Sequence, residues 1–254
     1  MSKNIAIIFA GGSGERMGSG IPKQFIEVEG KPIIIHTLEI FEEHPLVDAI
    51  YVACRSDYIN KLDKMTKKFF ITKITGIVPG GVTGQESIYK GLKAAFDSEG
   101  PDNVVLIHDG VRPCITPDTI TRNIEVQREK GTAITCNKFF ETPAISKDST
   151  MVDSLIDREE MYVVQAPQTF NLGEIISEHD KLREINPTYK GVIDSCTLMK
   201  NAGKDIFLVE GNRGNIKVTT PEDLYIFRAM LDYKEYREAL GLSDREIKEH
   251  LKKQ

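Results

Sequence analysis

The sequence predicts an α/β protein with a mostly parallel sheet. Short apolar runs alternate with longer amphipathic segments over residues 1–130, and glycine-rich turns follow several of the runs. Strands buried on both faces are apolar nearly throughout, whereas a helix that packs on a sheet is apolar on one side only. The alternation therefore indicates a parallel sheet flanked by helices, with ligands bound at the carboxyl ends of the strands.

Four strands and four helices are expected in this region. The strands are Ile5–Phe9, Ala49–Ala53, Ile74–Val78 and Val104–His108. The helices are Pro32–Glu43, Tyr58–Lys68, Gln85–Phe96 and Pro117–Lys130. Several of the helical segments begin with a proline or a polar cap, which are common signals for a helix start.

The region 137–164 interrupts this alternation. Two extended segments, Asn137–Ile145 and Met151–Val164, flank a turn near Lys147–Thr150. We expect a projecting β-hairpin arm there. Because such an arm exposes edge strands, we also expect a second subunit to pair with it, which would make the protein a homodimer.

The remainder of the chain is expected to be mainly helical. The expected elements are helices near Leu172–Glu184 and Asp194–Ala202, a strand at Asp205–Val209 and a last extended element at Asn215–Thr219. From Pro221 the chain is expected to be helical to its end, with a capping box at 243–246 that opens a charged final helix. We expect one domain over 1–232, with the arm at about 137–164, and a helical extension over 233–254.

Composition limits the possible partners. The 254 residues are 40% hydrophobic and 28% charged, as in soluble globular proteins. A net charge of −5 without a basic run argues against nucleic-acid binding. No segment approaches the ~20 apolar residues of a membrane span, and the apolar start is too short for a signal peptide. The four cysteines are scattered, as free thiols in a reducing compartment would be, so we expect a cytoplasmic protein.

The glycine-rich loop after the first strand is the most informative segment. Its candidate phosphate-binding residues are Ala10, Gly11, Gly12, Gly14, Arg16 and Lys23. Bare backbone N–H groups can approach phosphate oxygens, and the two cations can neutralise them, so a triphosphate fits. No Gly-Lys-Ser/Thr triplet of a P-loop is present, and Met17 stands where the dinucleotide fingerprint of a dehydrogenase needs glycine. The alternative is a plain turn, for which the two cations would be needless.

Asp109 follows a buried strand and is the candidate Mg²⁺ ligand. Mg²⁺ prefers one or two carboxylates together with substrate phosphates, and a strand end facing a glycine loop offers both. Arg112 can orient Asp109 or steady the loop. A helix or turn cap is the alternative role for Asp109, and His108 is expected to be a packed residue.

Two further segments leave both functional and structural roles open. Gly81 and Ser87 belong to a third glycine-rich loop, which either contacts a base or ribose or merely connects a strand to a helix. Lys217 lies between Ile216 and Val218 on an extended run. Its side chain points either to solvent or toward the phosphates.

Four motifs in order resemble the 2-C-methyl-D-erythritol 4-phosphate and ribitol-5-phosphate cytidylyltransferase family. They are Ala-Gly-Gly-x-Gly-x-Arg-Met with Pro-Lys-Gln at 10–24, His-Asp-Gly-Val-Arg-Pro at 108–113, Ala-Pro-Gln-Thr-Phe at 166–170 and Asn-Ile-Lys-Val-Thr-Thr-Pro-Glu-Asp-Leu at 215–224. The resemblance covers about residues 3–232. It implies a three-layer Rossmann-like nucleotidyltransferase fold whose β-arm interlocks two subunits.

The resemblance also implies a reaction and a role for each candidate residue. CMP passes from CTP to a sugar- or polyol-phosphate, and pyrophosphate leaves. Arg16, Lys23 and Lys217 are implied to be catalytic, and Asp109 to bind Mg²⁺. The implied nucleotide contacts are Ala10, Gly11, Gly12, Gly14, Gly81 and Ser87. The implied acceptor contacts are Asp109, Arg112, Thr142 and Arg158, of which Arg158 reaches the neighbouring subunit's acceptor.

Several positions depart from the family pattern. Val82, Thr83 and Gly84 replace acidic residues and an arginine in the nucleotide loop, which leaves UTP or GTP open as the donor. Ala166 and Ile193 replace two threonines on the acceptor side. Because unpaired buried polar groups discriminate strongly, these losses favour a polyol- or other sugar-phosphate such as ribitol 5-phosphate over 2-C-methyl-D-erythritol 4-phosphate of isoprenoid synthesis. The ribitol enzymes usually keep both threonines, so a less common acceptor also stays open. A nucleotide-binding dimer without catalysis is a further alternative.

Overall fold

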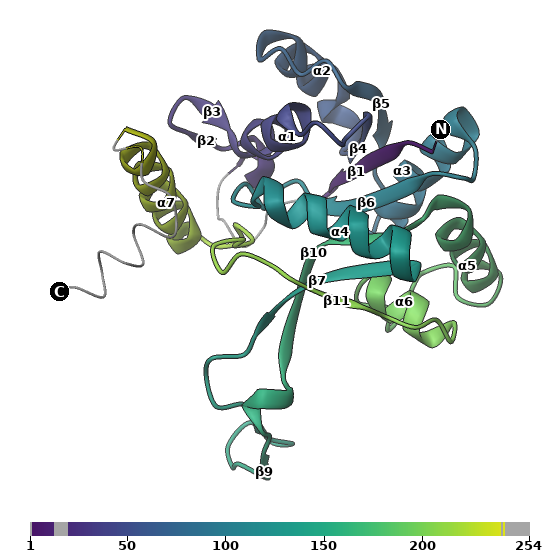
Figure 1. Ribbon diagram of the computed structural model, residues 1–254, viewed down its shortest axis with the longest axis vertical. Coiled ribbons are helices and arrows are strands. Elements are labelled where there is room, and N and C mark those ends of the chain that lie inside the picture. The colour runs from purple at the N-terminus through teal and green to yellow at the C-terminus, as the bar shows by residue number, and fades with distance from the viewer. Residues whose placement is uncertain (1, 13–19, 240, 242–254) are drawn as a thin grey trace.

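The central sheet has helices on both faces in the computed structural model, which describes residues 2–12, 20–239 and 241 (Figure 1). Its strands are β1 (Asn4–Ala10), β4 (Ala49–Cys54), β5 (Ile74–Pro79), β6 (Val104–Asp109), β7 (Thr132–Lys138), β10 (Tyr162–Asn171) and β11 (Leu208–Glu210). Within the described residues these seven strands lie in the order β11-β7-β10-β6-β1-β4-β5. Only β10 runs antiparallel to its neighbours in this sheet, so the predicted mostly parallel α/β fold is confirmed.

Helices pack on each face of the sheet to form two large cores. One face carries α1 (Ile33–Glu43), α2 (Ile59–Lys68) and α4 (Pro117–Lys130), and the other carries α3 (Gly84–Glu99), α5 (Leu172–Ile185) and α6 (Ser195–Asn201). Along β1, Ile5 and Ile7 enter one core while Ala6 and Ile8 enter the other. Burial on both faces explains why this strand is a continuous apolar run.

The predicted elements of the first 130 residues are confirmed to within three residues at their ends, but the inner parts of two central strands, β7 and β10, were missed. β7 and the inner half of β10 carry buried polar residues that break an apolar pattern. Thr135 donates to the Pro167 carbonyl at 2.7 Å, and Thr169 donates to Asn123 Oδ1 at 3.3 Å. These hydrogen bonds satisfy the threonines inside the core, which is why the strands tolerate them.

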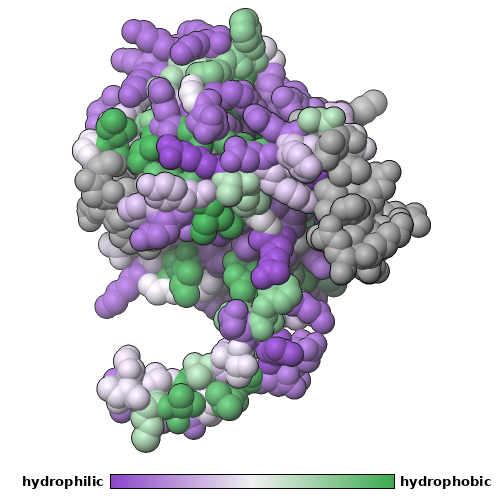
Figure 2. Space-filling model, turned by 90° about the vertical axis from the view of Figure 1, so that its left-hand side faces the viewer, coloured by the Kyte–Doolittle hydropathy of each residue, from purple (hydrophilic) through white to green (hydrophobic). Residues whose placement is uncertain are grey.

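The outer halves of β7 and β10 continue beyond the sheet as an arm (Figure 1). Lys138 still pairs with Tyr162, and a short pair, β8 (Ala144–Ile145) and β9 (Ser154–Leu155), lies farther out. The 3₁₀ turn η4 (Arg158–Glu160) precedes β10. The arm exposes large apolar side chains (Figure 2), namely Phe140, Ile145, Met151, Val152, Leu155, Tyr162, Val163 and Val164.

The last described helix, α7 (Pro221–Ala239), packs on a third, smaller core. Phe227 contributes from the helix, and Val218 and Val111 contribute from the segments before it and after β6. Val28 and Ile33, from the short pair β2 (Glu27–Val28) and β3 (Lys31–Pro32) and the start of α1, complete it. The expected element at 215–219 is extended but pairs with no strand, and the expected final helix from Ser243 lies outside the described residues.

Two short 3₁₀ turns, η2 (Lys23–Phe25) and η3 (Ser56–Tyr58), complete the described elements. Among the helices described here, none combines the length and apolar character that crossing a membrane requires.

Candidate active site

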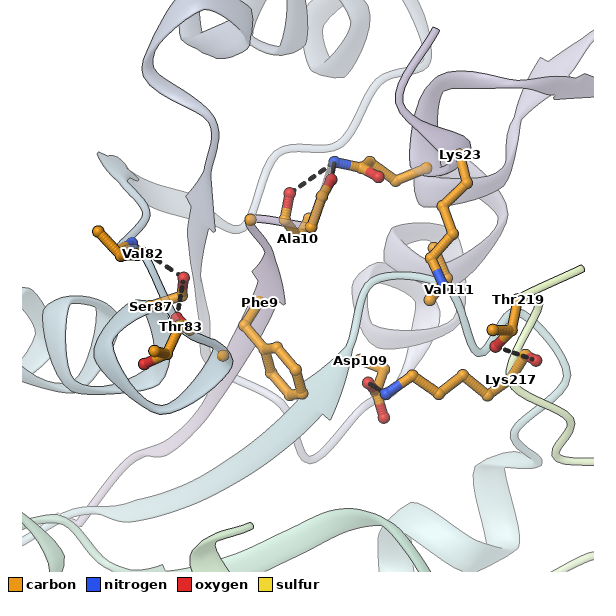
Figure 3. A pocket seen from close by; sticks show the side chains of 15 residues that line it. Phe9, Ala10, Lys23, Val82, Thr83, Ser87, Asp109, Val111, Lys217 and Thr219 are labelled. Carbon is orange, nitrogen blue, oxygen red and sulfur yellow. Dashed lines mark hydrogen bonds and ion pairs between the residues drawn. The ribbon is translucent and has the colours of Figure 1, made fainter. Parts of the chain in front are cut away.

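A cavity of about 410 Å³ lies at the carboxyl ends of β1 and β6 (Figure 3). Most of the residues predicted for nucleotide binding and catalysis line it, namely Ala10, Gly11, Gly12, Lys23, Gly81, Ser87, Asp109 and Lys217. Phe9, Gln24, Val82, Thr83, Gly84, Val111 and Thr219 complete the lining. Gly14 and Arg16 lie outside the described residues. Segments far apart in the sequence thus meet where a parallel sheet is expected to bind its ligand.

Gln24 holds the start of the glycine loop. Its buried side chain donates from Nε2 to the carbonyls of Ala10, at 2.7 Å, and Gly12, at 3.2 Å. A Cβ at Gly11 would lie 2.6 Å from Ser87 Oγ, so a larger residue would displace that hydroxyl from its hydrogen bonds to Gly81 and Thr83. Gln24 was not among the predicted site residues, although it directly follows Lys23 in the Pro-Lys-Gln motif.

The opposite wall is the loop before α3 together with the first turn of that helix. Thr83 caps the helix by accepting from the Glu86 N–H at 3.1 Å. Ser87 Oγ accepts from the Gly81 N–H and donates to the Thr83 carbonyl, both at 2.9 Å. Val82 has a side chain that is 97% exposed. This wall places the positive end of a helix beside the cavity, where an anionic ligand is favoured.

Glu86 fixes the same loop from within the helix. Its carboxylate accepts from the Val82 N–H at 2.8 Å, and this hydrogen bond lowers the pKa of Glu86. The carboxylate also pairs with Lys90 at 3.2 Å. The loop is therefore tied to α3 at Gly81, Val82 and Thr83 without the acidic residues and the arginine that the family pattern places there.

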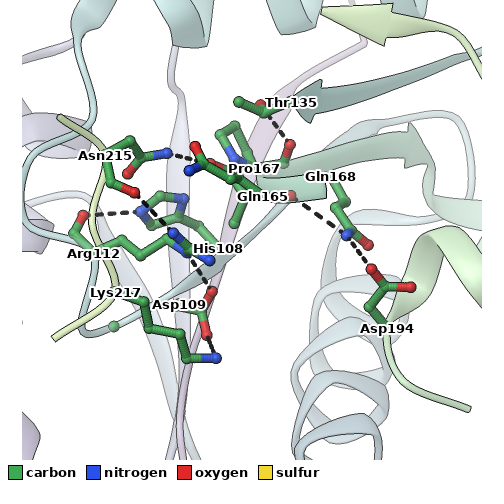
Figure 4. Close-up of polar contacts among 12 residues, drawn as sticks. His108, Asp109, Arg112, Thr135, Gln165, Pro167, Gln168, Asp194, Asn215 and Lys217 are labelled. Atoms are coloured by element: carbon green, nitrogen blue, oxygen red, sulfur yellow. Dashed lines mark hydrogen bonds and ion pairs between the residues drawn. The ribbon is translucent and has the colours of Figure 1, made fainter. Parts of the chain in front are cut away.

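Asp109 is the central charged group of the polar contacts drawn in Figure 4. It is only 6% exposed. Lys217 Nζ lies 2.5 Å from its Oδ1, and Arg112 Nε donates to its Oδ2 at 2.9 Å. Burial alone would raise the pKa of Asp109, but Lys217 and Arg112 outweigh it and lower the pKa below its usual value. The carboxylate is thus charged at neutral pH.

His108, the residue before Asp109, contacts the backbone of Arg112. Its Nε2 lies 3.1 Å from the Arg112 carbonyl, and burial lowers the pKa of His108 to about 4. The ring is therefore neutral at pH 7, as expected for a packed residue rather than a catalytic base.

Lys23 and Lys217 reach the cavity from different elements. Lys23 extends from η2 toward the side where Asp109 lies (Figure 3). Lys217 lies on the extended segment before α7, where the Val218 N–H donates to the Val111 carbonyl at 2.9 Å. Val218 is fully buried, so its neighbour Lys217 is directed away from the small core and toward Asp109.

The predicted acceptor residues of the arm do not join this cavity within one chain. Thr142 and Arg158 are exposed, and Arg158 Nη1 donates to the Phe140 carbonyl of the arm itself at 3.4 Å. Among the described residues, the cavity lining includes none from the arm. Of the two positions that depart from the family pattern, Ala166 is buried, whereas the side chain of Ile193 is 86% exposed.

The cavity combines a glycine loop, a helix N-terminus and lysines beside a charged aspartate, on a mostly parallel α/β sheet. That combination defines the class of nucleotidyltransferases, enzymes that bind a nucleoside triphosphate and stabilise charge on its phosphates.

The chain belongs to the 2-C-methyl-D-erythritol 4-phosphate cytidylyltransferase family, whose sequence profile matches residues 4–233. It is 44% identical over 241 residues to a ribitol-5-phosphate cytidylyltransferase of Streptococcus agalactiae serotype Ia, which covers 94% of this chain and 100% of that protein. A 2-C-methyl-D-erythritol 4-phosphate cytidylyltransferase of Clostridium botulinum strain Okra is 40% identical over 233 residues, or 91% of this chain and 99% of that one. The protein is therefore a cytidylyltransferase.

A solved structure agrees with this assignment. The 4-diphosphocytidyl-2C-methyl-D-erythritol synthase of Anaerococcus prevotii superposes with a TM-score of 0.78 at 30% identity, covering 91% of this chain and 96% of that one.

Proposed function

We propose that the protein transfers CMP from CTP to ribitol 5-phosphate or a closely similar polyol-phosphate, giving a CDP-polyol and pyrophosphate. One observation of this chain carries the catalytic part: Lys217 and Asp109 lie 2.5 Å apart in the cavity that the glycine loop also lines. The choice of acceptor is supported by the ribitol-5-phosphate cytidylyltransferases of Streptococcus agalactiae and Vibrio parahaemolyticus, at 44% and 45% identity.

The proposed reaction is an in-line displacement at the α-phosphorus. An oxygen of the acceptor phosphate forms a bond to the α-phosphorus, the bond from that phosphorus to the β-phosphate oxygen breaks, and pyrophosphate takes the electron pair. No side-chain nucleophile is required, because positioning and charge stabilisation account for most of the catalysis. Lys23 and Lys217 stabilise the negative charge that develops, and Arg16 is proposed to assist them.

The donor set of the cavity fits Mg²⁺. Of the described residues that line the cavity, Asp109 alone carries a carboxylate, and Mg²⁺ is commonly held by one or two carboxylates plus substrate phosphates. When bound, Mg²⁺ would neutralise phosphate charge. Before substrate binds, Lys217 and Arg112 balance the charge of Asp109.

We further propose that the protein is a homodimer held by the arm. Its exposed apolar side chains form the kind of surface that a partner subunit buries. In this arrangement Arg158 and Thr142 of one subunit act in the partner's site, where the guanidinium can bind the acceptor phosphate. That role accounts for two exposed residues that do not join the cavity of their own chain.

Pyrophosphate release from CTP and Mg²⁺ across a panel of acceptors tests the proposal. The panel contains ribitol 5-phosphate, 2-C-methyl-D-erythritol 4-phosphate, glycerol 3-phosphate and several pentose and hexitol phosphates. We expect the highest kcat/KM with ribitol 5-phosphate. A preference for the methylerythritol compound would replace our acceptor. Activity with UTP or GTP instead of CTP would replace the proposed donor. No pyrophosphate release with any nucleotide or acceptor would favour a non-catalytic role.

A further inference from the structure

Lys217 lies on a segment that no sheet ladder holds. Residues 211–220 connect β11 to α7 as extended backbone and turns, and only a few backbone hydrogen bonds fix them. The hydrogen bond from the Val218 N–H to the Val111 carbonyl holds the segment on one side of Lys217, so a second constraint on the other side would fix its Nζ beside Asp109. Two residues before Lys217 is Asn215, which is fully buried.

Asn215 contacts two different parts of the site through its side chain and its backbone (Figure 4). Its Nδ2 donates to the carbonyl of Ala166 on β10 at 2.7 Å. Its own carbonyl accepts from Arg112 Nη1 at 2.8 Å, and Arg112 in turn donates to Asp109. One residue thus ties the Lys217 segment to the central sheet and also orients the arginine that holds Asp109.

The other half of the Asn215 amide is poorly satisfied. Its Oδ1 is buried and has no hydrogen-bond partner among the described residues. A buried polar atom without a partner costs stability, so an amide is not the side chain that packing alone would favour at this position. The bond from Nδ2 to Ala166 is therefore the feature that an asparagine adds here.

We propose that Asn215 is a positioning residue that holds Lys217 and Arg112 on Asp109 by anchoring their segment to β10. Its effect on turnover rests on the proposed function of this site, whereas its effect on geometry does not. Without the anchor, Lys217 Nζ and Arg112 lose their fixed distances to Asp109, and misplacement of a reacting group by about 1 Å can cost ~10²-fold in rate.

Crystal structures and kinetics of Asn215→Ala test the proposal. We expect Lys217 Nζ to lie more than about 4 Å from Asp109, beyond ion-pair reach, and kcat to fall ~10²-fold. The KM for CTP should change by less than about threefold, since the glycine loop and α3 are untouched. Asn123→Ala is the matched control, because Asn123 is equally buried and donates to the Thr119 carbonyl at 2.8 Å, away from the cavity.

Asn215→Asp keeps the shape of the side chain. It is the variant to test if Asn215→Ala does not fold. At neutral pH its carboxylate cannot donate to Ala166, so kcat should fall. Burial raises the pKa of such a carboxyl, and protonation restores an O–H donor. The ratio of variant to wild-type kcat should therefore rise as the pH falls, which loss of packing alone would not produce.

A double-mutant cycle with Lys217→Ala separates positioning from general destabilisation. If Asn215 acts through Lys217, Asn215→Ala should lower kcat by less than about threefold in the Lys217→Ala background. Equal losses in both backgrounds would overturn the action through Lys217, and unchanged distances from both Lys217 and Arg112 to Asp109 in the variant structure would overturn the proposal as a whole. Wild-type inactivity combined with a displaced Lys217 would refute the proposed function and leave the positioning role intact.

Discussion

The cavity and the arm differ in how completely a single chain builds them. At the cavity, β6 is buried at every residue, and residues from five separate stretches of the chain line one space. On the arm, both short strands are exposed at every residue, and the Leu155 side chain is 67% exposed. The described cavity residues therefore come together within one chain, whereas the arm exposes the apolar surface that the proposed dimer would bury.

Under the proposed function, this difference predicts that the nucleotide site forms within one chain, whereas part of the acceptor site comes from the arm. The nucleotide residues already surround a common volume, so CTP binding should need only one chain. The proposed acceptor residues Thr142 and Arg158 are exposed and separate from that volume, so acceptor binding should depend on the dimer.

The largest effect is expected from the lysines of the cavity. Lys217→Ala or Lys23→Ala should lower kcat by ~10²–10³, because each removes a cation aimed at developing phosphate charge. Circular dichroism and thermal unfolding should show an intact fold. Lys204→Ala is the control, since Lys204 contacts Glu174 on α5 and does not line the cavity. A near-normal rate in either cavity variant would contradict the mechanism.

The next largest effect should come from the tip of the arm. Leu155→Asp places a charge in the proposed interface and should shift the protein toward monomer in sedimentation experiments at micromolar concentration. Activity should fall about tenfold or more, because a buried unpaired charge costs several kcal/mol, while the Kd for CTP stays within about twofold.

Ile185→Asp is the matched control for this experiment. Ile185 is an exposed aliphatic residue at the end of α5, outside both the arm and the cavity lining. A monomeric wild type, or a dimer that Leu155→Asp leaves unchanged, would contradict the proposal that the arm is a dimer interface distinct from the cavity.

A smaller and more selective effect is expected for Arg158→Ala. The KM for the acceptor should rise about tenfold, because a charge-assisted hydrogen bond to phosphate contributes about 1.5–3 kcal/mol. The KM for CTP and the dimer should be retained. Lys138→Ala removes an exposed cation from the same arm and is the control. Equal changes in the two KM values would argue against a role specific to the acceptor.

Acid should weaken the body of the molecule through its buried histidines. Burial lowers the pKa of His108 to about 4 and that of His179 to about 3. An unfolded histidine binds its proton near pH 6.5, so between pH 6.5 and about 4 the unfolded state holds more protons and the free energy of unfolding falls as the pH falls.

His179→Phe tests this pH dependence. It should reduce the slope of unfolding free energy against pH by up to ~1.4 kcal/mol per unit in that window. The segment 137–164 contains no histidine, so the arm makes no histidine contribution to this slope. Identical slopes for wild type and variant, measured by urea unfolding from pH 7 to 4, would contradict the assignment.

The fold was predictable where burial on both faces imposes an apolar run, as in β1 and β6. It was not predictable where the core is polar. Thr135 and Thr169 each hydrogen-bond to Asn123 inside the molecule, and Pro167 within β10 argues against a central strand when read from sequence alone. The inner part of β10 is a strand because it pairs with β6 and β7, and no local sequence pattern indicates that pairing.

The candidate site was predictable in its charged residues and glycines, because their chemistry is visible in the sequence. The residues that hold these groups in place were not predictable. Gln24 and Asn215 act by donating to backbone carbonyls of distant segments, and only the folded chain reveals which carbonyls they reach. Their place in motifs beside Lys23 and Lys217 was the one available signal.

The position of β10 in the middle of the sheet has a consequence for how the molecule is assembled during synthesis. Asn4 pairs with Val104, and Val104 pairs with Asn171 on its other side. Contacts so distant in sequence form late, since a long loop must close before they contribute. A nascent chain that stops before β10 leaves β6 with an open edge. The strand that carries Asp109 is therefore enclosed only after the whole arm has been translated.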